Sequence, residues 1–244
     1  MMGVIGGSGL SRLSSLKIDE QIQLDTPFGE PSAPLFRGWI DKKPLIFLPR
    51  HGEYHTIPPH LINYRANLWA MHHLGVRQVL AVAAVGGINP ELAPGSLAVP
   101  DQIIDYTWGR ESSIYTAHFS ADKHIDFTHP YDAVLRGRLL TTAQTSQIKL
   151  VDGGAYAVTQ GPRLETAAEI KRLARDGADM VGMTAMPEAA IARELEMAYV
   201  TLAIVANHAA GLSDKLITVA EIQQTTTDAM TQVYRVIQGL LTGT

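Results

Sequence analysis

Side chains that could bind an anion come directly after two apolar runs near the start of the sequence. Arg50 and His51 follow the run at residues 44–48, and a glycine-rich turn containing Ser8 follows residues 4–5. A guanidinium presents N–H donors in a fork that fits phosphate oxygens, and glycines let backbone amides approach an anion closely. The turn has neither the Gly-Lys-Ser/Thr of a Walker A loop nor the spacing of a dinucleotide-binding turn. These residues therefore favour a phosphate site, with an ordinary tight turn as the alternative for residues 6–9.

Two histidines four residues apart, His51 and His55, raise the question of a metal site. Zinc peptidases hold their metal with a pair of this spacing on one face of a helix. Pro58 and Pro59 argue against a helix here, so we expect no metal. We expect His51 to donate a hydrogen bond to the anion, and simple packing is the alternative.

Further polar residues follow apolar runs in the second half of the chain. Glu165 lies near an expected helix start, where it would either interact with the helix dipole or accept an N–H from a ligand. Thr184 would either cap the next helix or face an anion at its N-terminus. Asn207 ends an apolar strand, and its amide can both donate and accept hydrogen bonds, although asparagine also suits a turn. The glycines at residues 86–87 would either bring backbone amides to a ligand or only mark a bend.

The elements that position these residues alternate between strands and helices, which is typical of βαβ units. We expect strands at residues 4–5, 44–48, 78–85, 155–159, 179–182 and 199–206, and helices at residues 61–74, 164–175, 187–196 and 222–240. In such sheets ligands bind at the carboxyl ends of the strands, where all the candidate residues lie. The expected fold is a single α/β domain over residues 1–244, with a twisted, mostly parallel or mixed sheet flanked by helices.

The composition excludes several other classes of protein. Of the 244 residues, 46% are hydrophobic and 18% are charged, which excludes general disorder. The net charge of -4 lacks the basic excess of a nucleic-acid-binding protein. There are no cysteines, which excludes disulfides, thiol nucleophiles and thiolate metal sites. Apolar runs fall short of the ~20 residues of a membrane span and the N-terminus lacks a basic leader, so we expect a cytoplasmic protein without membrane or nucleic-acid partners.

The stretch from Tyr106 to Tyr131 follows neither the helical nor the strand period. It mixes aromatic residues with His118, His124 and His129. A long irregular segment in a compact domain is usually a functional loop or a contact surface.

Taken together, these motifs resemble those of the trimeric purine nucleoside phosphorylase and methylthioadenosine phosphorylase family. The resemblance spans nearly the whole chain and is carried by residues 6–10, 50–52, 62–67, 86–90, 161–166 and 182–188. It implies phosphorolysis, in which phosphate displaces a purine from the ribosyl C1′ to give the free base and a sugar 1-phosphate. It also implies a homotrimer that uses phosphate as co-substrate, with neither a metal nor an organic cofactor.

The roles of family residues carry over to matching positions of this chain. The positions that match phosphate ligands are Ser8, Arg50, His51, Thr184 and the backbone of Ala84. Met183 matches the residue beneath the ribose, and Ala83 stands where relatives often have a polar side chain. Leu164 stands where relatives often stack a phenylalanine on the base, so the apolar contact is kept without aromatic stacking.

The residues expected at the base indicate a 6-oxopurine. Asn207 and Ala209 stand where methylthioadenosine phosphorylases usually have aspartates that read a 6-amino group. An amide NH₂ can donate to a 6-oxo group, which an ionised carboxylate would repel. Glu165 can accept the N1 proton that a 6-oxopurine carries and adenine lacks. A site built for one of these hydrogen-bond patterns can reject the other by about 10⁴ in favourable cases.

The residues expected at the 5′ end of the sugar indicate an apolar group. Val219, with Ile222 one turn further on, stands where nucleoside phosphorylases commonly have a histidine for the 5′-hydroxyl. An unpartnered buried hydroxyl there would cost about 1–3 kcal/mol, whereas a methylthio group fits an apolar pocket. The alternative is that both residues are ordinary helix core. The segment around His124 resembles the one that closes a neighbouring subunit's site.

The combined expectation is an enzyme that prefers 5′-methylthioinosine and forms hypoxanthine and 5-methylthioribose 1-phosphate. Arg50 and His51 would position phosphate, Glu165 would orient the base through N1–H, and Asn207 would stabilise charge on the leaving base at O6 and N7. The alternatives are an inosine/guanosine phosphorylase, a methylthioadenosine phosphorylase and, outside catalysis, a purine-binding sensor.

Overall fold

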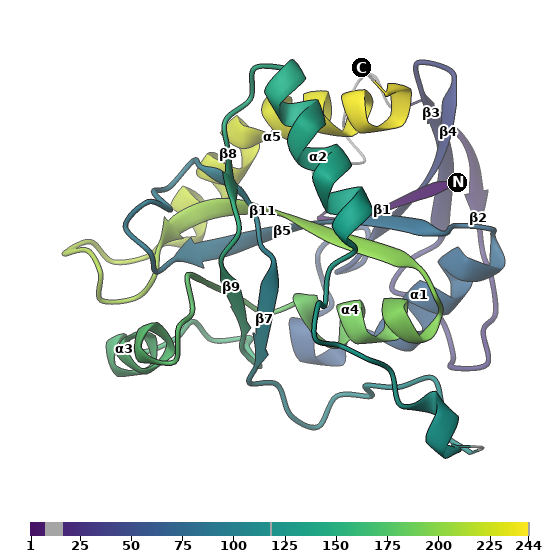
Figure 1. The fold of residues 1–244 in the computed structure, drawn as a ribbon, viewed down its shortest axis with the longest axis horizontal. Helices are drawn as coiled ribbons and strands as arrows, with labels where there is room; N and C mark the ends of the chain where they lie inside the picture. Colours follow the sequence, from purple (N-terminus) through teal and green to yellow (C-terminus); the bar gives the residue numbers. More distant parts are fainter. Residues whose placement is uncertain (8–16, 118, 244) are drawn as a thin grey trace.

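The computed structural model describes residues 1–7, 17–117 and 119–243 (Figure 1). Its strands are β1 (Met2–Gly6), β2 (Lys17–Ile22), β3 (Leu35–Ile40), β4 (Lys43–Pro49), β5 (Gln78–Gly87), β6 (Leu97–Val99), β7 (Gln102–Asp105), β8 (Leu150–Asp152), β9 (Ala155–Val158), β10 (Met180–Gly182) and β11 (Ala198–His208). Its α-helices are α1 (Tyr64–His73), α2 (Ala133–Thr145), α3 (Ala167–Arg175), α4 (Ala185–Glu194) and α5 (Val219–Thr242), and its short 3₁₀ helices include η2 (Pro59–Leu61) and η3 (Ala121–Lys123).

The strands of the described residues form one mixed sheet in which β5 is central. Along one edge of β5, β1 pairs in parallel with residues 78–81 and β10 pairs antiparallel with residues 86–87. Along its other edge β5 pairs in parallel with β11 over almost its whole length. The order of the main path is β2-β3-β4-β1-β5-β10-β9-β7, with β6 and β8 joined through β11. The expected α/β fold with a mixed sheet flanked by helices is confirmed.

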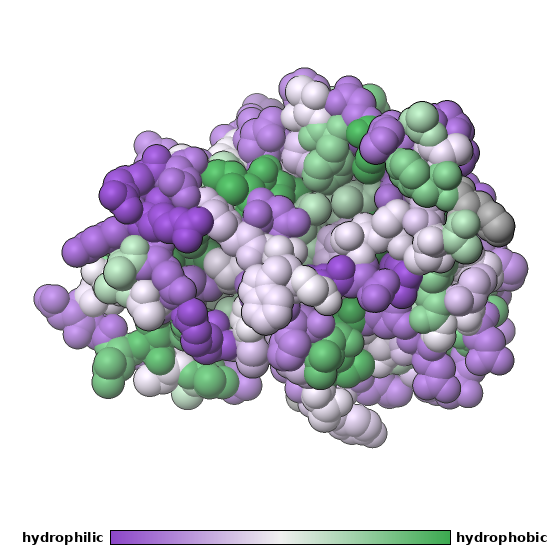
Figure 2. All heavy atoms as spheres, turned by 90° about the horizontal axis from the view of Figure 1, so that it is seen from below, coloured by the Kyte–Doolittle hydropathy of each residue, from purple (hydrophilic) through white to green (hydrophobic). Residues whose placement is uncertain are grey.

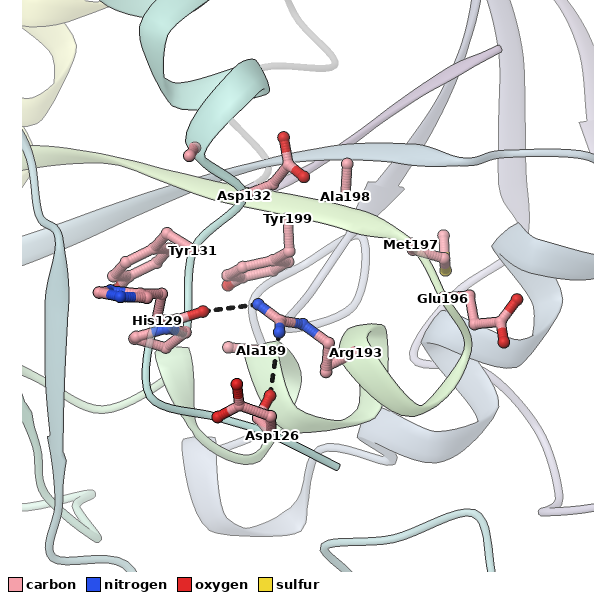
Figure 3. A pocket seen from close by; sticks show the side chains of 12 residues that line it. Asp126, His129, Tyr131, Asp132, Ala189, Arg193, Glu196, Met197, Ala198 and Tyr199 are labelled. Carbon is pink, nitrogen blue, oxygen red and sulfur yellow. Dashed lines mark hydrogen bonds between the residues drawn. The ribbon is translucent and has the colours of Figure 1, made fainter. Parts of the chain in front are cut away.

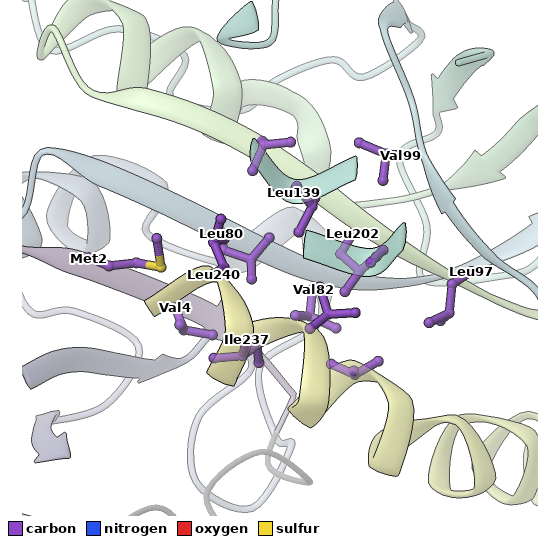
Figure 4. Packing of buried hydrophobic residues seen from close by; sticks show 14 of the residues in the cluster. Met2, Val4, Leu80, Val82, Leu97, Val99, Leu139, Leu202, Ile237 and Leu240 are labelled. Carbon is purple, nitrogen blue, oxygen red and sulfur yellow. The ribbon is translucent and has the colours of Figure 1, made fainter. Parts of the chain in front are cut away.

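The sheet separates two hydrophobic clusters. On one face, α2 and α5 pack against β1, β5 and β11 through residues such as Val82, Leu202 and Ile237 (Figures 1 and 4). On the other face, α1 and α4 supply a second cluster that includes Leu68, Met71 and Ile191. Burial of apolar side chains on both faces fixes the central strands, whose sequences are almost continuously apolar for this reason.

The expected helix at residues 164–175 begins later, at Ala167. Thr166 and Glu169 form a capping box, in which each side chain accepts a hydrogen bond from the backbone N–H of the other. This motif ends the preceding loop at Thr166 and leaves Leu164 and Glu165 outside the helix.

Other expected boundaries also need correction. Leu61 lies in the 3₁₀ turn η2, and α1 starts only at Tyr64, where the side chain of Asn63 accepts from the N–H of Ala66. The helix α4 covers Ala185–Glu194, but Met186 has non-helical φ and ψ, so its regular part does start at Pro187 as expected. The glycines at 86–87 continue β5 instead of ending it, because both pair with β10.

Several elements were not expected from the sequence. The strands β6 and β8 have three residues each and β7 has four, which is too short for a period to be recognised. The strand β2 pairs at the outer edge of the sheet, and its exposed charged residues hide any alternation. The helix α2 has weak amphipathic character and is marked mainly by its cap, Asp132.

In the described part of the chain, no helix is both long enough and apolar enough to span a membrane. The same residues contain no group of three or more His, Cys, Asp or Glu side chains placed to hold a metal ion. On the face seen from below, hydrophobic patches alternate with hydrophilic ones (Figure 2). Exposed large hydrophobic residues of the chain include Trp108, Leu164 and Val219.

Candidate active site

The candidate site lies at a gap along the central strand. The pairing of β5 with β1 ends at Ala81 and its pairing with β10 begins at Gly86, so residues 82–85 of β5 have no strand partner on that edge among the described residues. Ala84 is the exposed residue of β5, between the buried Ala83 and Val85. Alternate residues of a strand turn their N–H and C=O to the same edge, so the backbone of Ala84 faces the gap as that of Val82 does.

Arg50 contacts β5 at this gap and is almost completely buried, with 2% of its side chain exposed. Its Nη1 donates to the carbonyl of Val82 at 3.0 Å, and its Nε and Nη2 donate to the two oxygens of Glu188 at 2.6 and 2.9 Å. These three bonds leave one N–H on each terminal nitrogen of the five that a guanidinium has. A pair of donors in fixed positions is what a phosphate oxygen edge can bind.

Glu188 holds Arg50 from the first turn of α4 and is itself fully buried. Its Oε1 also accepts from the Tyr199 hydroxyl of β11 at 2.9 Å. Burial opposes the charge of Arg50, but the ion pair with Glu188 outweighs it and raises the pKa of Arg50. Burial and the charge of Glu188 likewise raise the pKa of Tyr199, which keeps the hydroxyl as a donor. The guanidinium is therefore always charged and cannot swing away.

His51 follows Arg50 and lies half-buried, stacked on His55 with ring centroids 4.4 Å apart. Its Nδ1 lies 2.9 Å from the carbonyl oxygen of Ile57, so Nδ1 carries the proton and donates. Burial, and then the charge of Arg50, lowers the pKa of His51 to about 4. At neutral pH, Nε2 is therefore an acceptor. The expectation that His51 donates to the anion is wrong for this state, because its one N–H is already used.

Thr184 sits at the N-cap of α4, one turn before Glu188, and its side chain makes no capping hydrogen bond. The N-terminus of a helix carries partial positive charge and attracts anions. Arg50 contacts Val82 beside Ala84 and Glu188 in the helix that follows Thr184, and a phosphate subsite formed by these residues stays a prediction. Ser8, which was also expected there, lies outside the described residues.

Glu165 lies in the loop before α3, half-buried, and its Oε1 accepts from the Thr159 hydroxyl at 2.6 Å. Its second oxygen stays available to a ligand, since a carboxylate has acceptor capacity to spare. The neighbouring Leu164 is 43% exposed, which leaves its side chain free to contact a base.

Asn207 lies on β11 beside Gly86, just after an irregularity in the β5–β11 register. Its Nδ2 lies 3.4 Å from the place where a β-carbon on Gly86 would be, so a glycine there makes room for the amide. The same nitrogen donates to the carbonyl of His208 at 2.7 Å, which leaves one N–H and the amide oxygen. The following turn brings Gly211 against Ala167 at the start of α3, so the loops of Asn207 and Glu165 touch.

Met183 connects the base and phosphate parts of the site. Gly161 has φ near +64°, which favours glycine, and a β-carbon there would lie 2.5 Å from the sulfur of Met183. Met183 therefore packs over the loop that carries Leu164 and Glu165. Its expected role beneath a ribose stays a prediction.

The residues expected at the 5′ end of the sugar differ in their exposure and in their place in the fold. Val219 is 70% exposed at the start of α5 and Ile222 is half-buried, so Val219 is not ordinary helix core. His124 follows η3, which lies at the opposite side of the molecule from the carboxyl ends of β5 and β11 (Figure 1). Within one chain the fold therefore separates His124 from the other candidate residues.

A cavity of about 510 Å³ lies elsewhere, between α4, the start of β11 and residues 126–133 (Figure 3). Arg193 crosses it and donates to the carbonyls of Asp126 and His129 at 3.0 and 2.6 Å. None of the expected site residues lines this cavity. The contacts of Arg193 instead tie the irregular segment to α4.

Known proteins resemble this chain over nearly all of its length. The family model described as "Phosphorylase superfamily" matches residues 2–242. A probable S-methyl-5′-thioinosine phosphorylase of Pseudomonas syringae pv. tomato is 48% identical over 230 residues, which cover 94% of both chains. A 6-oxopurine nucleoside phosphorylase of Pyrococcus furiosus is 44% identical over 226 residues, which cover 91% of this chain and 84% of that one. The methylthioadenosine phosphorylase of Schistosoma mansoni, solved with adenine, superposes with a TM-score of 0.94 at 31% identity, over 99% of this chain and 90% of that one.

The family match, the identities and the superposition all cover nearly the whole chain, including the strands and loops that carry the candidate site. The chain belongs to the phosphorylase superfamily.

Several residues of the site were not expected from the sequence, namely Thr159, Glu188 and Tyr199. Glu188 could have been noticed, because a carboxylate among Ala185, Ala189 and Ala192 lies on the apolar face of its helix and needs a partner. Thr159 and Tyr199 gave no such indication, since both residue types are common in strands.

Proposed function

We propose that this protein cleaves the N-glycosidic bond of a 6-oxopurine nucleoside by phosphorolysis and prefers 5′-methylthioinosine. The observation that carries the reaction type is the buried Arg50, which keeps two N–H donors beside the exposed Ala84 and the N-cap of α4. Glu165 and Asn207 support the base preference. Relatives named for methylthioinosine and for 6-oxopurine nucleosides support the same substrate class.

In the proposed reaction, hydrogen phosphate binds with its oxygens toward Arg50, Thr184, Ser8 and the amide of Ala84. Neutral His51 accepts a hydrogen bond from the P–OH group at Nε2 and does not take the proton, because its Nδ1 donates to the carbonyl of Ile57. A phosphate oxygen bonds to C1′ while the C1′–N9 bond breaks and its electron pair leaves with the base. The transition state is loose and cationic at the sugar, where bound phosphate stabilises it. The proton of hydrogen phosphate passes through water to the purine anion, so the products are a neutral base and the dianion of the sugar 1-phosphate.

At the nucleoside end, Glu165 accepts N1–H while Thr159 holds its other oxygen. Asn207 stabilises charge that develops at O6 and N7 of the leaving base. Leu164 contacts the base and Met183 lies beneath the ribose. Val219 and Ile222 face the 5′-methylthio group.

The site is completed, in this proposal, by a neighbouring copy of the chain in a cytoplasmic homotrimer. His124 lies far from its own chain's site, which supports a role at the neighbour's 5′ pocket (Figure 1). Light scattering should give three times the chain mass of 26.5 kDa, and a monomer with full activity would contradict the shared site. The reaction uses phosphate as co-substrate and neither a metal nor an organic cofactor, so dialysis against EDTA should leave the rate unchanged.

The decisive test compares kcat/KM for methylthioinosine, inosine and methylthioadenosine, with and without phosphate. We expect turnover only with phosphate, and methylthioinosine as the best substrate. Turnover without phosphate would replace phosphorolysis by hydrolysis, and equal rates on inosine and methylthioinosine would remove the apolar 5′ pocket. Tight purine binding without any phosphate-dependent product would favour the purine-binding sensor.

A further inference from the structure

Arg110 lies in the irregular segment after β7 and makes six hydrogen bonds close to the candidate site. It is not itself among the residues expected to contact the substrate. Its Nη1 donates to the carbonyls of Met183 at 2.8 Å and Met186 at 2.6 Å. Its Nη2 donates to the carbonyls of Gln160 at 2.9 Å and Thr159 at 3.2 Å. The side chain of Gln160 and the Tyr64 hydroxyl accept further bonds from Nε and Nη1 at 3.2 Å each.

These contacts are unusual for an arginine because, within the described residues, its hydrogen-bond acceptors include no carboxylate. The guanidinium is half-buried, and its Cζ lies 5.6 Å from the centre of the Tyr64 ring. Burial lowers the pKa of Arg110, yet an arginine stays charged in proteins. Backbone carbonyls accept most of its hydrogen bonds, with Asp105 stabilising the charge at longer range, and those carbonyls would lose their donors without Arg110.

The carbonyls belong to the two loops that carry the nucleoside side of the site. Thr159 and Gln160 follow β9, and the Thr159 hydroxyl holds Glu165. Met183 and Met186 flank Thr184 at the start of α4. The packing of Met183 against Gly161 is the apolar contact between the same two loops. One planar guanidinium therefore bridges the loop that would read the base and the loop that would bind ribose and phosphate.

We propose that Arg110 is a positioning residue that sets the separation of these two loops, so that C1′ of the bound nucleoside faces the phosphate. This inference rests on the proposed function. A lysine cannot replace Arg110, because its compact ammonium has only three N–H donors. The planar guanidinium has five, which is enough to hydrogen-bond carbonyls of both loops at once. Loss of the bridge changes the geometry of the transition state, while Arg50 stays in place because Glu188 and Val82 hold it.

The test uses Arg110→Ala and Arg110→Lys in the full-length protein, with Arg138→Ala as the matched control. Arg138 also donates to a backbone carbonyl, that of Leu240, and to Gln78 at the amino end of β5, far from the strand gap. We expect kcat for methylthioinosine to fall roughly a hundredfold in Arg110→Ala, the loss that a displacement of about 1 Å can cause. The KM for phosphate should change less than about threefold, since no phosphate ligand is removed. Methylguanidinium should restore part of kcat to Arg110→Ala and none to Arg138→Ala.

Amide hydrogen exchange of the same proteins without substrate gives a second readout. Exchange should accelerate in residues 159–165 and 183–187 of both Arg110 variants and stay unchanged there in Arg138→Ala. Unchanged exchange in Arg110→Ala overturns the inference, as does a kcat within threefold of the wild type or a loss confined to the KM for phosphate. If the wild type shows no phosphate-dependent turnover, the proposed function fails, and the exchange data alone then decide whether Arg110 bridges the loops.

Discussion

The phosphate half and the nucleoside half of the candidate site are built in opposite ways. Under the phosphate half, a buried network joins Arg50, directly after β4, to Glu188 of α4 and Tyr199 of β11. In the nucleoside half, Leu164 and Val219 are exposed on loops or helix starts, and Glu165 and Asn207 are only half-buried.

Because of this difference, the residues that determine the reaction type are part of the core, whereas the residues that determine substrate specificity are not. Substituting a member of the buried network disturbs the core, because an unpaired buried charge is costly. Substituting a residue of the nucleoside half changes local hydrogen bonds or an apolar contact and leaves the sheet intact. A fold of this design can keep phosphorolysis while the preferred base or 5′ group varies, in agreement with the different substrates named for its relatives.

The largest effect should come from Glu188→Ala, which leaves the charge of Arg50 buried without a partner. The free energy of unfolding should fall by about 3–5 kcal/mol, as for other broken buried ion pairs. Chemical denaturation measures it. The double variant Arg50→Met with Glu188→Leu removes both charges and should recover most of the stability without recovering activity. A loss below about 1 kcal/mol in Glu188→Ala, the size seen for exposed pairs, would contradict a buried network.

Asn207→Asp should change substrate preference and leave stability nearly unaltered. An ionised carboxylate repels a 6-oxo group and accepts from a 6-amino group, so the ratio of kcat/KM for methylthioinosine over methylthioadenosine should fall by roughly 10². Steady-state kinetics with both nucleosides gives the ratio, and His208→Gln on the next, exposed residue serves as control. If the ratio does not move, Asn207 does not read the base.

The smallest effect is expected for Val219→His, which offers a donor to a 5′-hydroxyl. The kcat/KM for inosine relative to methylthioinosine should rise roughly fivefold, because one hydrogen bond contributes about 1 kcal/mol. Val219→Ala removes apolar contact without adding a donor and should lower the efficiency with methylthioinosine alone. A histidine variant that behaves like the alanine variant would show that position 219 does not face the 5′ group.

Much of the fold could be predicted because buried parallel strands have continuous apolar sequences. The strands around residues 78–87 and 198–208 were recognised for this reason, and so was the last helix, whose apolar face repeats at helical spacing. The three-residue strands and the charged edge strand could not be recognised, since partners supplied by distant residues stabilise them. The start of α3 was misplaced because the Thr166–Glu169 capping box outweighs the apolar Leu164.

The candidate site, like the fold, was only partly predictable from the sequence. The sequence by itself determined which polar residues follow the strand ends, among them Arg50, Glu165, Thr184 and Asn207, because apolar runs mark those strands. Only the tertiary structure decided which of their hydrogen-bonding groups stay free. Glu188 and Val82 take three N–H groups of Arg50, Ile57 takes the one N–H of His51, and Arg110 joins two loops, all through contacts between residues distant in the sequence or set by turn geometry. Donor and acceptor capacity depends on such partners, which residue type and spacing do not specify.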